Sequence, residues 1–274
     1  MKSIKQNPTL IITCAFLLTG GFLLVFSFFS ALQTVAFVGL GLTFWGVIFS
    51  FAQSKTYVEG DLLDSSAQAT YSTIDRMIMD LKYNGQGYYI PAYPRDAALP
   101  EYLKNLRDPV VFISETFDGN PSLEELAQGK FISTQTRGVF VTAPGAGVMT
   151  QIERQLHLDL SKVPLEDLMD VLPKILTENL NLAKSANMIL TSRGVEFSAT
   201  GILYESLYNS ETTPKSLSLL GCPVVSAVAC ALAKASGKTV VISEQKILPN
   251  HSVFVNYTFI GRQKNEFSSS DSRD

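Results

Sequence analysis

The segment between Lys5 and Lys55 contains no Asp, Glu, Lys or Arg, and this feature constrains the fold more than any other. Its 49 residues suffice for two membrane-spanning helices, since each helix needs about 20 apolar residues. The alternative is a core hairpin of a soluble protein, but helices of soluble proteins almost always show a polar face. We therefore predict a transmembrane helical hairpin over residues 1–54, with spans near 10–29 and 32–52.

The lysines that flank this segment predict its orientation. Lys2 and Lys5 precede the first span, Lys55 follows the second, and the link between the spans carries no charge. Because positive residues favour the cytoplasmic side, both termini are expected in the cytoplasm, as in a multi-pass protein of the cell membrane. The lipid bilayer is thus the first predicted partner, and the absence of ionisable residues at membrane depth argues against a transporter.

Glycines within the two predicted spans bear on how the helices pack. Gly20 and Gly21 could face Gly39, Gly41 and Gly46 and allow close approach, or they are simply the glycines common in membrane helices. The same residues could join one hairpin to another. A homo-oligomer or a membrane-protein partner is therefore a second expectation.

Residues 55–274 have the composition of a globular domain and a net charge of −5. An acidic domain has no electrostatic reason to bind nucleic acid, so no such partner is expected. Cys14 lies in the predicted membrane segment, and Cys222 and Cys230 stand eight residues apart on one predicted helix. They provide no disulfide framework, in agreement with a reducing cytoplasmic compartment.

Helical and strand patterns alternate along this part and predict an α+β fold with mainly antiparallel strands. Predicted helices occupy residues 65–82, a short stretch around Ile152, 161–180 with a kink at Pro173, and 222–236. Predicted strands occupy residues 88–90, 110–113, 131–133, 139–142, 188–191, 195–199, 239–244 and 252–260. We predict a cytoplasmic domain over residues 55–262, either single or in two lobes that meet near 157–164, and a disordered tail over 263–274.

The sequence Pro144-Gly145-Ala146-Gly147, between a predicted strand and a predicted helix, is the nearest match to a phosphate-binding loop. It lacks the third glycine of a dinucleotide fingerprint and the Gly-Lys-Ser/Thr ending of a P-loop. A tight turn that leads into a helix explains the same residues. Gly145 and Gly147 are retained as ligand-binding candidates beside that plainer interpretation.

Cys222 stands at the start of a predicted helix, where the helix dipole would lower the pKa of its thiol. A nucleophilic cysteine also needs a base, and His157 and His251 are the only histidines. The plainer alternative is a small buried residue at a helix start. The sequence defines no catalytic set of residues.

The histidines and cysteines do not show the spacing of a metal-binding motif, so no metal is predicted. No other cofactor is predicted either. The acidic side chains that follow the glycine loop have the pattern of solvated charges on helix surfaces. They are Glu153, Asp159, Glu166 and Asp167.

The segment 221–259, which begins with Gly221-Cys222-Pro223-Val224-Val225-Ser226-Ala227 and ends with Val255-Asn256-Tyr257-Thr258-Phe259, resembles the closing helix and hairpin of 4-vinyl reductase-type small-molecule-binding domains. In that family a small-residue helix leads to a strand that ends in a glutamate and then to a strand that ends in an aromatic residue. Glu244 and Phe259 take those places here. Lys246 and Thr258 stand where the family often has cysteines, so no metal or thiol role carries over.

The resemblance implies an α+β domain with an apolar ligand pocket lined by this helix and the last two strands. The ligand-binding candidates are accordingly Cys222, Ser226, Glu244 and Phe259, with Gly145 and Gly147 from the loop. A two-span hairpin followed by such a domain is also similar to uncharacterised archaeal membrane proteins.

We therefore expect a membrane-anchored cytoplasmic domain that acts as a non-enzymatic binding or interaction module, of which a sensor is one form. Its expected partner is another protein or an apolar small ligand. The alternatives are a structural accessory subunit of a membrane complex and an enzyme that acts near the membrane through Cys222.

Overall fold

In the computed structural model, the charge-free segment forms a helical hairpin of α1 (Pro8–Ser30) and α2 (Gln33–Phe51). Its large apolar side chains point mostly outward; Phe28 and Phe29 are 85% and 82% exposed. The stretches Ile12–Ser30 and Gln33–Ser50 are long and apolar enough to cross a membrane, and only 11% of each is buried.

The glycines of the hairpin divide into two sets. A Cβ on Gly20 or Gly39 would lie 3.0 Å or less from the backbone of the other helix, and Gly46 lies equally close to Leu17. These three glycines therefore let the helices touch. Gly21 and Gly41 have nothing within 4 Å at the position of a Cβ, so they face outward.

The chain divides into two compact units, Met1–Val58 and Glu59–Asp274, and each is described by itself. The described residues are 8–30, 33–51, 60–94, 101–117, 119, 121–208, 214–248 and 252–261. The predicted tail over 263–274 and His251 lie outside them.

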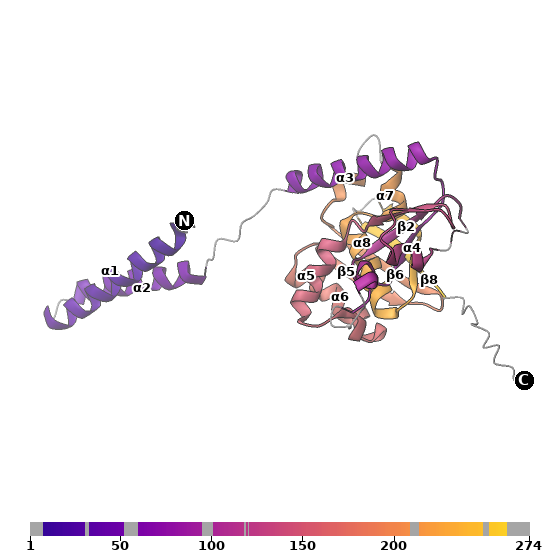
Figure 1. Cartoon of the computed structure of the whole chain (residues 1–274). Helices are drawn as coiled ribbons and strands as arrows, with labels where there is room; N and C mark the ends of the chain where they lie inside the picture. Colours follow the sequence, from indigo (N-terminus) through magenta and orange to yellow (C-terminus); the bar gives the residue numbers. More distant parts are fainter. Residues whose placement is uncertain are drawn as a thin grey trace, which may run out of the picture. The chain divides into compact units, whose positions relative to one another are not determined.

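The second unit combines helices with one sheet (Figure 1). The α-helices are α3 (Gly60–Leu81), α4 (Leu123–Ala127), α5 (Ala146–Leu156), α6 (Leu165–Lys174), α7 (Lys215–Leu220) and α8 (Pro223–Ser236). The strands are β1 (Gly87–Ile90), β2 (Val110–Ser114), β3 (Ile132–Ser133), β4 (Gly138–Thr142), β5 (Ser185–Leu190), β6 (Gly194–Thr200), β7 (Thr239–Leu248) and β8 (Ser252–Ile260). The 3-10 helices are η1 (Glu101–Arg107), η2 (Leu160–Lys162) and η4 (Glu205–Tyr208), and η3 (Ile175–Asn179) is a π-helix.

The sheet has eight strands in the order β3-β4-β2-β1-β7-β8-β6-β5, and every neighbouring pair is antiparallel. The predicted α+β class with mainly antiparallel strands is therefore confirmed. β1 pairs with β7 through Tyr88↔Val241 and Tyr89↔Val240. This pairing joins strands from before and after residues 157–164, so the sheet runs continuously past the lobe boundary considered above.

Helix α8 lies on one face of the sheet and is buried from Pro223 to Lys234. It packs on β1, β7 and β8, and α5, α6 and η2 contact it as well. A helix that is apolar all round is stable only where other elements surround it. Pro223 in its first turn and Gly237 as its left-handed C-cap, with φ of 65°, delimit it as predicted.

The opposite face of the sheet has a second, smaller core under η1 and α4. Tyr88, Ile90, Phe112, Phe140 and Val241 supply the strand side of this core. Leu106 from η1 and Leu126 from α4 cover them. The two sides of β1 are therefore buried against different helices, which explains its unbroken burial.

Two helices differ from their predictions. Helix α3 begins at Gly60 and not at 65, so Asp64 lies inside the helix, where it accepts a hydrogen bond from the Ser206 hydroxyl. The single helix predicted over 161–180 is divided into η2, α6 and η3, and α6 passes into the π-helix at Ile175, two residues after Pro173. A π-turn accommodates the loss of a backbone donor at proline.

Hydrogen bonds from α7 to Asp75 and to the Tyr71 carbonyl, which accepts from the Ser216 hydroxyl at 3.1 Å, hold α3 beside α7 (Figure 1). Asp75 accepts hydrogen bonds from the backbone N–H groups of Lys215 at 3.1 Å and Ser216 at 2.7 Å. These are the first residues of α7, whose N–H groups have no partner within the helix. The side chain therefore satisfies the start of α7 and fixes α3 to the domain.

Gly145 is the point of closest approach between α5 and α8. Its N–H donates to the Ser226 hydroxyl at 3.0 Å, and a Cβ there would overlap the backbone of Ser226 and Ala227. Gly147, two residues further, has nothing within 4 Å of a Cβ. Gly147 therefore has room for a larger residue, whereas Gly145 does not.

Replacement of Gly145 by Ala should lower the free energy of unfolding by about 2 kcal/mol or more, because α5 must move away from α8. Gly147→Ala is the matched control and should stabilise the protein by up to about 1 kcal/mol, since it adds a helix-favouring residue in open space. Denaturant unfolding followed by near-ultraviolet circular dichroism measures both. Equal stability of Gly145→Ala and the wild type would contradict the close approach.

Candidate functional site

A cavity of about 830 Å³ lies at the C-terminal end of α8. Four segments form most of its wall: 91–94 after β1, 121–124 at the start of α4, the 135–136 turn, and 234–239 at the end of α8. Leu106, Ser161, Ile260 and Gly261 complete it. The cavity is open to solvent and has the size of known small-molecule sites, which span roughly 300–1,000 Å³.

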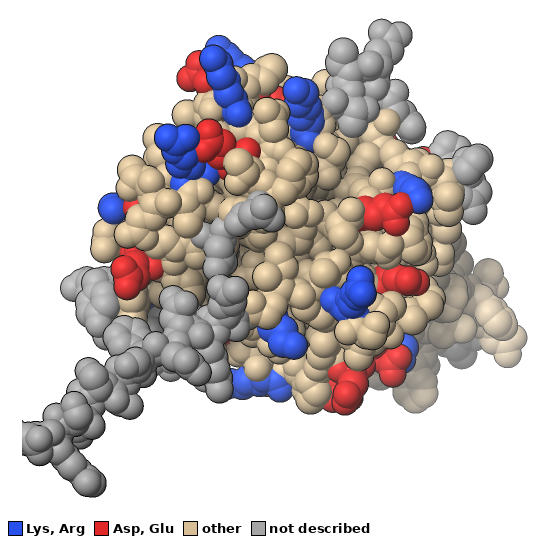
Figure 2. All heavy atoms as spheres, turned by 90° about the vertical axis from the view of Figure 1, so that its right-hand side faces the viewer, with Lys and Arg blue, Asp and Glu red and all other residues tan. Residues whose placement is uncertain are grey.

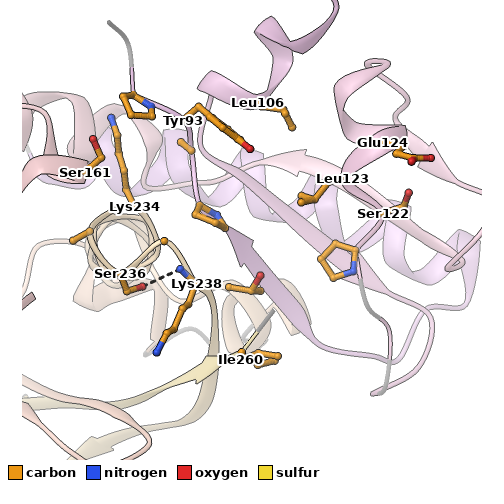
Figure 3. Close-up of a pocket in the computed structure, with 18 of the residues that line it drawn as sticks. Tyr93, Leu106, Ser122, Leu123, Glu124, Ser161, Lys234, Ser236, Lys238 and Ile260 are labelled. Atoms are coloured by element: carbon orange, nitrogen blue, oxygen red, sulfur yellow. Dashed lines mark hydrogen bonds between the residues drawn. The ribbon is translucent and has the colours of Figure 1, made fainter. Parts of the chain in front are cut away.

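The wall is apolar over much of its area and polar at separate points. Pro91, Leu106, Leu123 and Ile260 contribute apolar surface, and Tyr93 from the segment after β1 is 37% exposed (Figure 3). Hydroxyl and amide groups lie among them; Ser122 Oγ, for example, donates to Gln135 Oε1 at 3.2 Å. Such a surface suits a ligand that is itself part apolar and part polar.

The first fixed corner of the cavity is a buried ion cluster around Lys234. The Lys234 side chain is 1% exposed, and its Nζ donates to Glu153 Oε1 at 2.6 Å and to Asp159 Oδ2 at 3.0 Å. Glu153 comes from α5 and also accepts the Leu160 N–H at 3.2 Å. The cluster therefore ties the end of α8 to α5 and to the start of η2.

Asp159 links this cluster to the cavity wall through Ser161. Its Oδ1 accepts from the Ser161 N–H at 3.0 Å and from the Ser161 hydroxyl at 2.6 Å. The prediction that Glu153 and Asp159 are solvated was therefore wrong. The missed signal was Lys234 itself, the single charge in a helix that is otherwise small and apolar, since such a charge must find buried partners.

The second fixed corner is Glu125 of α4, which is 1% exposed. Its carboxylate accepts from Ser133 Oγ at 2.5 Å, Thr134 Oγ1 at 3.0 Å and Lys130 Nζ at 3.3 Å. The Ser133 hydrogen bond is the largest cause that lowers the pKa of Glu125 to about 2. Glu125 thereby holds the turn that contains Gln135 against α4. The two parts of the cavity wall formed by this turn and by the start of α4 are fixed relative to each other.

The predicted site residues Cys222, Ser226 and Gly145 do lie together, but inside the packed core. All three are buried, and Ser226 and Cys222 have no exposed surface. Burial raises the pKa of the Cys222 thiol and outweighs the lowering by the backbone N–H groups at the start of α8, so the expected net lowering is not found. The Gly145 N–H is taken up by Ser226 and is not available to a phosphate.

Buried tyrosines satisfy the backbone around Cys222. The hydroxyls of Tyr71, Tyr89 and Tyr257 donate to the carbonyls of Gly221, Leu220 and Val225 at 2.5, 2.5 and 2.8 Å. The Cys222 N–H donates to the Tyr208 hydroxyl at 2.9 Å. The junction between α7 and α8 is therefore a hydrogen-bonded core, and burial raises the pKa of each tyrosine.

The other predicted residues lie elsewhere. Glu244 stands at an irregularity of β7, where it pairs with Lys246 and accepts from Asn256 Nδ2 at 3.0 Å, and Lys246 is the chief cause that lowers its pKa. Phe259 packs on the core with the Lys238 ammonium 6.0 Å from its ring centre. Gly147 is exposed in α5. The cavity wall contains none of the six candidates.

On the face in Figure 2, charges of both signs are scattered around a largely uncharged centre, without a basic patch of the kind that binds nucleic acid. Among the described residues, no cluster of three His, Cys, Asp or Glu side chains has the arrangement of a metal site.

Comparison with known proteins assigns the family. A family model described as a domain of unknown function, DUF7982, matches residues 9–259, so the chain belongs to this family. The match begins in α1 and ends in β8, and it therefore includes the hairpin and the domain together. Neither a curated protein nor a solved structure gives a significant match to the chain.

Lys234→Met should lower the free energy of unfolding by about 3–5 kcal/mol, because two carboxylates would stay buried without their cation. Adding Glu153→Gln and Asp159→Asn to the same chain should restore most of the loss, since the cluster is then neutral. Lys238→Met, at the exposed rim, is the control and should change stability by less than about 0.5 kcal/mol. Denaturant unfolding tests all three, and a fully stable Lys234→Met single variant would refute the cluster.

Glu125→Gln should unfold at a lower temperature than the wild type at pH 7, because the amide loses acceptors that Ser133 and Thr134 require. A carboxylate with a lowered folded-state pKa contributes stability above its unfolded pKa and loses it as the pH falls through the folded value. The difference should therefore shrink below pH 4.5 and close near pH 2. Thermal melts of the wild type and Glu125→Gln across this pH range test the prediction, with Glu124→Gln as the exposed control. A difference in melting temperature that stays constant down to pH 2 would contradict it.

Proposed function

We propose that this protein is a membrane-anchored binding module whose ligand site is the cavity at the end of α8. In this proposal the hairpin crosses the cell membrane twice, and both termini lie in the cytoplasm. The observation that supports the binding role is a cavity open to solvent, whose wall is held at two places. One is the hydrogen-bonded carboxylate of Glu125, and the other is the ion cluster of Lys234 with Glu153 and Asp159. Such preorganised walls are typical of binding sites.

The exposed side chains of the hairpin support the anchor. Phe22, Phe28 and Phe29 are between 70% and 85% exposed, and an apolar surface of this extent is unfavourable in water. Helix α8, together with α7, is equally apolar over Lys215–Ser236, but 89% of that stretch is buried within the domain. The apolar hairpin therefore needs a lipid environment, whereas α8 has its own protein environment.

The resemblance to 4-vinyl reductase-type domains would place a ligand between α8 and the last two strands. Val225, Ala229 and Val255 in that layer have no exposed surface. We therefore place the ligand at the end of the helix. The buried thiol of Cys222 favours a binding role over a thiol-based reaction.

Native mass spectrometry of the full chain, released from its own membrane, tests this proposal. A small molecule should co-purify with the wild type and be lost from Ala235→Trp, which fills the cavity from α8. Ala69→Trp, on the exposed side of α3, is the matched control and should keep the molecule. Retention of the molecule by both variants, or its absence from the wild type, would contradict a ligand site in this cavity.

A further inference from the structure

The end of α8 presents hydrogen-bond acceptors to the cavity. Helix α8 has 14 residues and ends at Ser236, and the last carbonyls of a helix have no partner within it. Within the part of the chain that the structure describes, no donor bonds to the carbonyl of Ala235 or of Ser236. Both residues are partly exposed and line the cavity. The same end of the helix is the negative end of its dipole, which favours a cation.

The two lysines of the wall do not occupy these carbonyls. The Lys234 ammonium donates to Glu153 and Asp159. The Lys238 ammonium lies 6.0 Å from the centre of the Phe259 ring. The acceptors at the end of α8 are therefore available to a ligand that donates.

Two hydroxyl groups beside the end of α8 are also acceptors. A hydroxyl has one proton to donate and two lone pairs that accept. Ser236 Oγ donates to the Leu232 carbonyl at 2.6 Å, and Ser161 Oγ donates to Asp159 Oδ1 at 2.6 Å. Because both protons are used within the protein, these two wall residues can only accept from a ligand.

A second group of acceptors lies at the start of α4, on the other side of the cavity (Figure 3). Glu124 is exposed there, and among the described residues its carboxylate has no partner. Ser133 donates its one proton to Glu125, so the Thr136 hydroxyl is the donor in the hydrogen bond that it shares with Ser133. Thr136 therefore also offers only lone pairs to a ligand.

The wall between these two groups of acceptors is mainly apolar. Figure 3 shows Tyr93, Leu106 and Leu123 between Ser236 on one side and Glu124 on the other. An apolar chain suits this middle part, and a cationic hydrogen-bond donor suits each side. An ammonium group is such a donor, since it carries a charge and three N–H groups and accepts nothing.

Resting on the proposed function, we infer that the cavity binds an aliphatic diamine or polyamine. One ammonium group donates to the carbonyls at the end of α8, a second pairs with Glu124, and the methylene chain lies along Leu106 and Leu123. The net charge of −5 over residues 55–274 favours the approach of such a cation. The inference adds the chemical class of the ligand to the binding role of the cavity.

The test titrates the full chain in phosphatidylcholine nanodiscs at pH 7 with aliphatic diamines of three to eight methylene groups. Saturation-transfer difference NMR gives the dissociation constants, and Ala235→Trp defines the signal that comes from the cavity. The diamine that binds most tightly is compared with the monoamine, the diol and the dicarboxylate of the same length. The diamine should bind about tenfold more tightly than the monoamine or the diol, as expected for one more charged hydrogen bond. The dicarboxylate should not bind.

A pair of variants tests the contact at the start of α4. Glu124→Gln should remove most of the advantage of the diamine over the monoamine, because an amide cannot form an ion pair with the second ammonium. Glu166→Gln is the matched control, since Glu166 is an exposed carboxylate of α6 and is not among the wall residues. It should keep the tenfold difference.

The outcomes separate this inference from the proposed function. Equal or tighter binding of the monoamine, the diol or the dicarboxylate would overturn the ligand class and leave the binding role standing. An advantage of the diamine that survives in Glu124→Gln, or that is lost equally in Glu166→Gln, would do the same. If no diamine gives a signal that Ala235→Trp removes, the ligand class is likewise overturned. The binding role fails with it only if no molecule co-purifies with the wild type.

Discussion

Helix α8 is the element on which the rest of the domain depends. Its residues Pro223–Lys234 are buried, so the sheet, α5, α6 and η2 must all fit around it. Small side chains at Ser226 and Ala227 let the backbone of Gly145 approach, and four tyrosines satisfy the backbone where α7 passes into α8. These contacts leave the end of the helix in one position, and that position places Lys234 at the cavity.

Burial of α8 explains why the residues predicted to form the site lie apart from the cavity. Cys222, Ser226 and Gly145 are drawn into the tightest packing of the domain, where a thiol and an amide have structural roles. The cavity forms where packing ends, beyond Lys234 and at the first residue of β7. At two points of its wall, buried carboxylates hold polar side chains: Asp159 holds Ser161 and Lys234, and Glu125 holds the turn that carries Gln135.

Much of the fold was predictable from local patterns. Apolar residues at helical spacing predicted α3 and α6, and a run of small residues between Pro223 and Gly237 predicted α8. Short runs of β-branched and aromatic residues bounded by glycine and proline predicted most of the strands, because these signals are local. The order of the strands was not predictable, since the pairing of β1 with β7 joins residues about 150 positions apart. The hydrogen bond between Asp64 of α3 and Ser206 joins residues that are almost as remote in sequence.

Most of the candidate site could not be predicted from the sequence either, because its contacts also join residues that are far apart along the chain. Lys234 meets Glu153 and Asp159 across 81 and 75 residues, and no local spacing marks such a pair. Gly145 and Cys222 were proposed as site residues because the sequence alone does not distinguish a glycine or cysteine of a binding site from one in a turn or in the core. A single lysine in an apolar helix was the one usable signal, and it indicates a buried partner without naming it.

In our proposal α1 and α2 lie in lipid, whereas the similarly apolar α8 is enclosed by its own domain. Photolabelling of the full chain in its native membrane with a lipid-dissolved diazirine, followed by peptide mapping, measures this directly. Label should concentrate on residues 12–50 and be absent from residues 223–234. Labelling of α8 at the level of α1, or an unlabelled hairpin, would contradict the account.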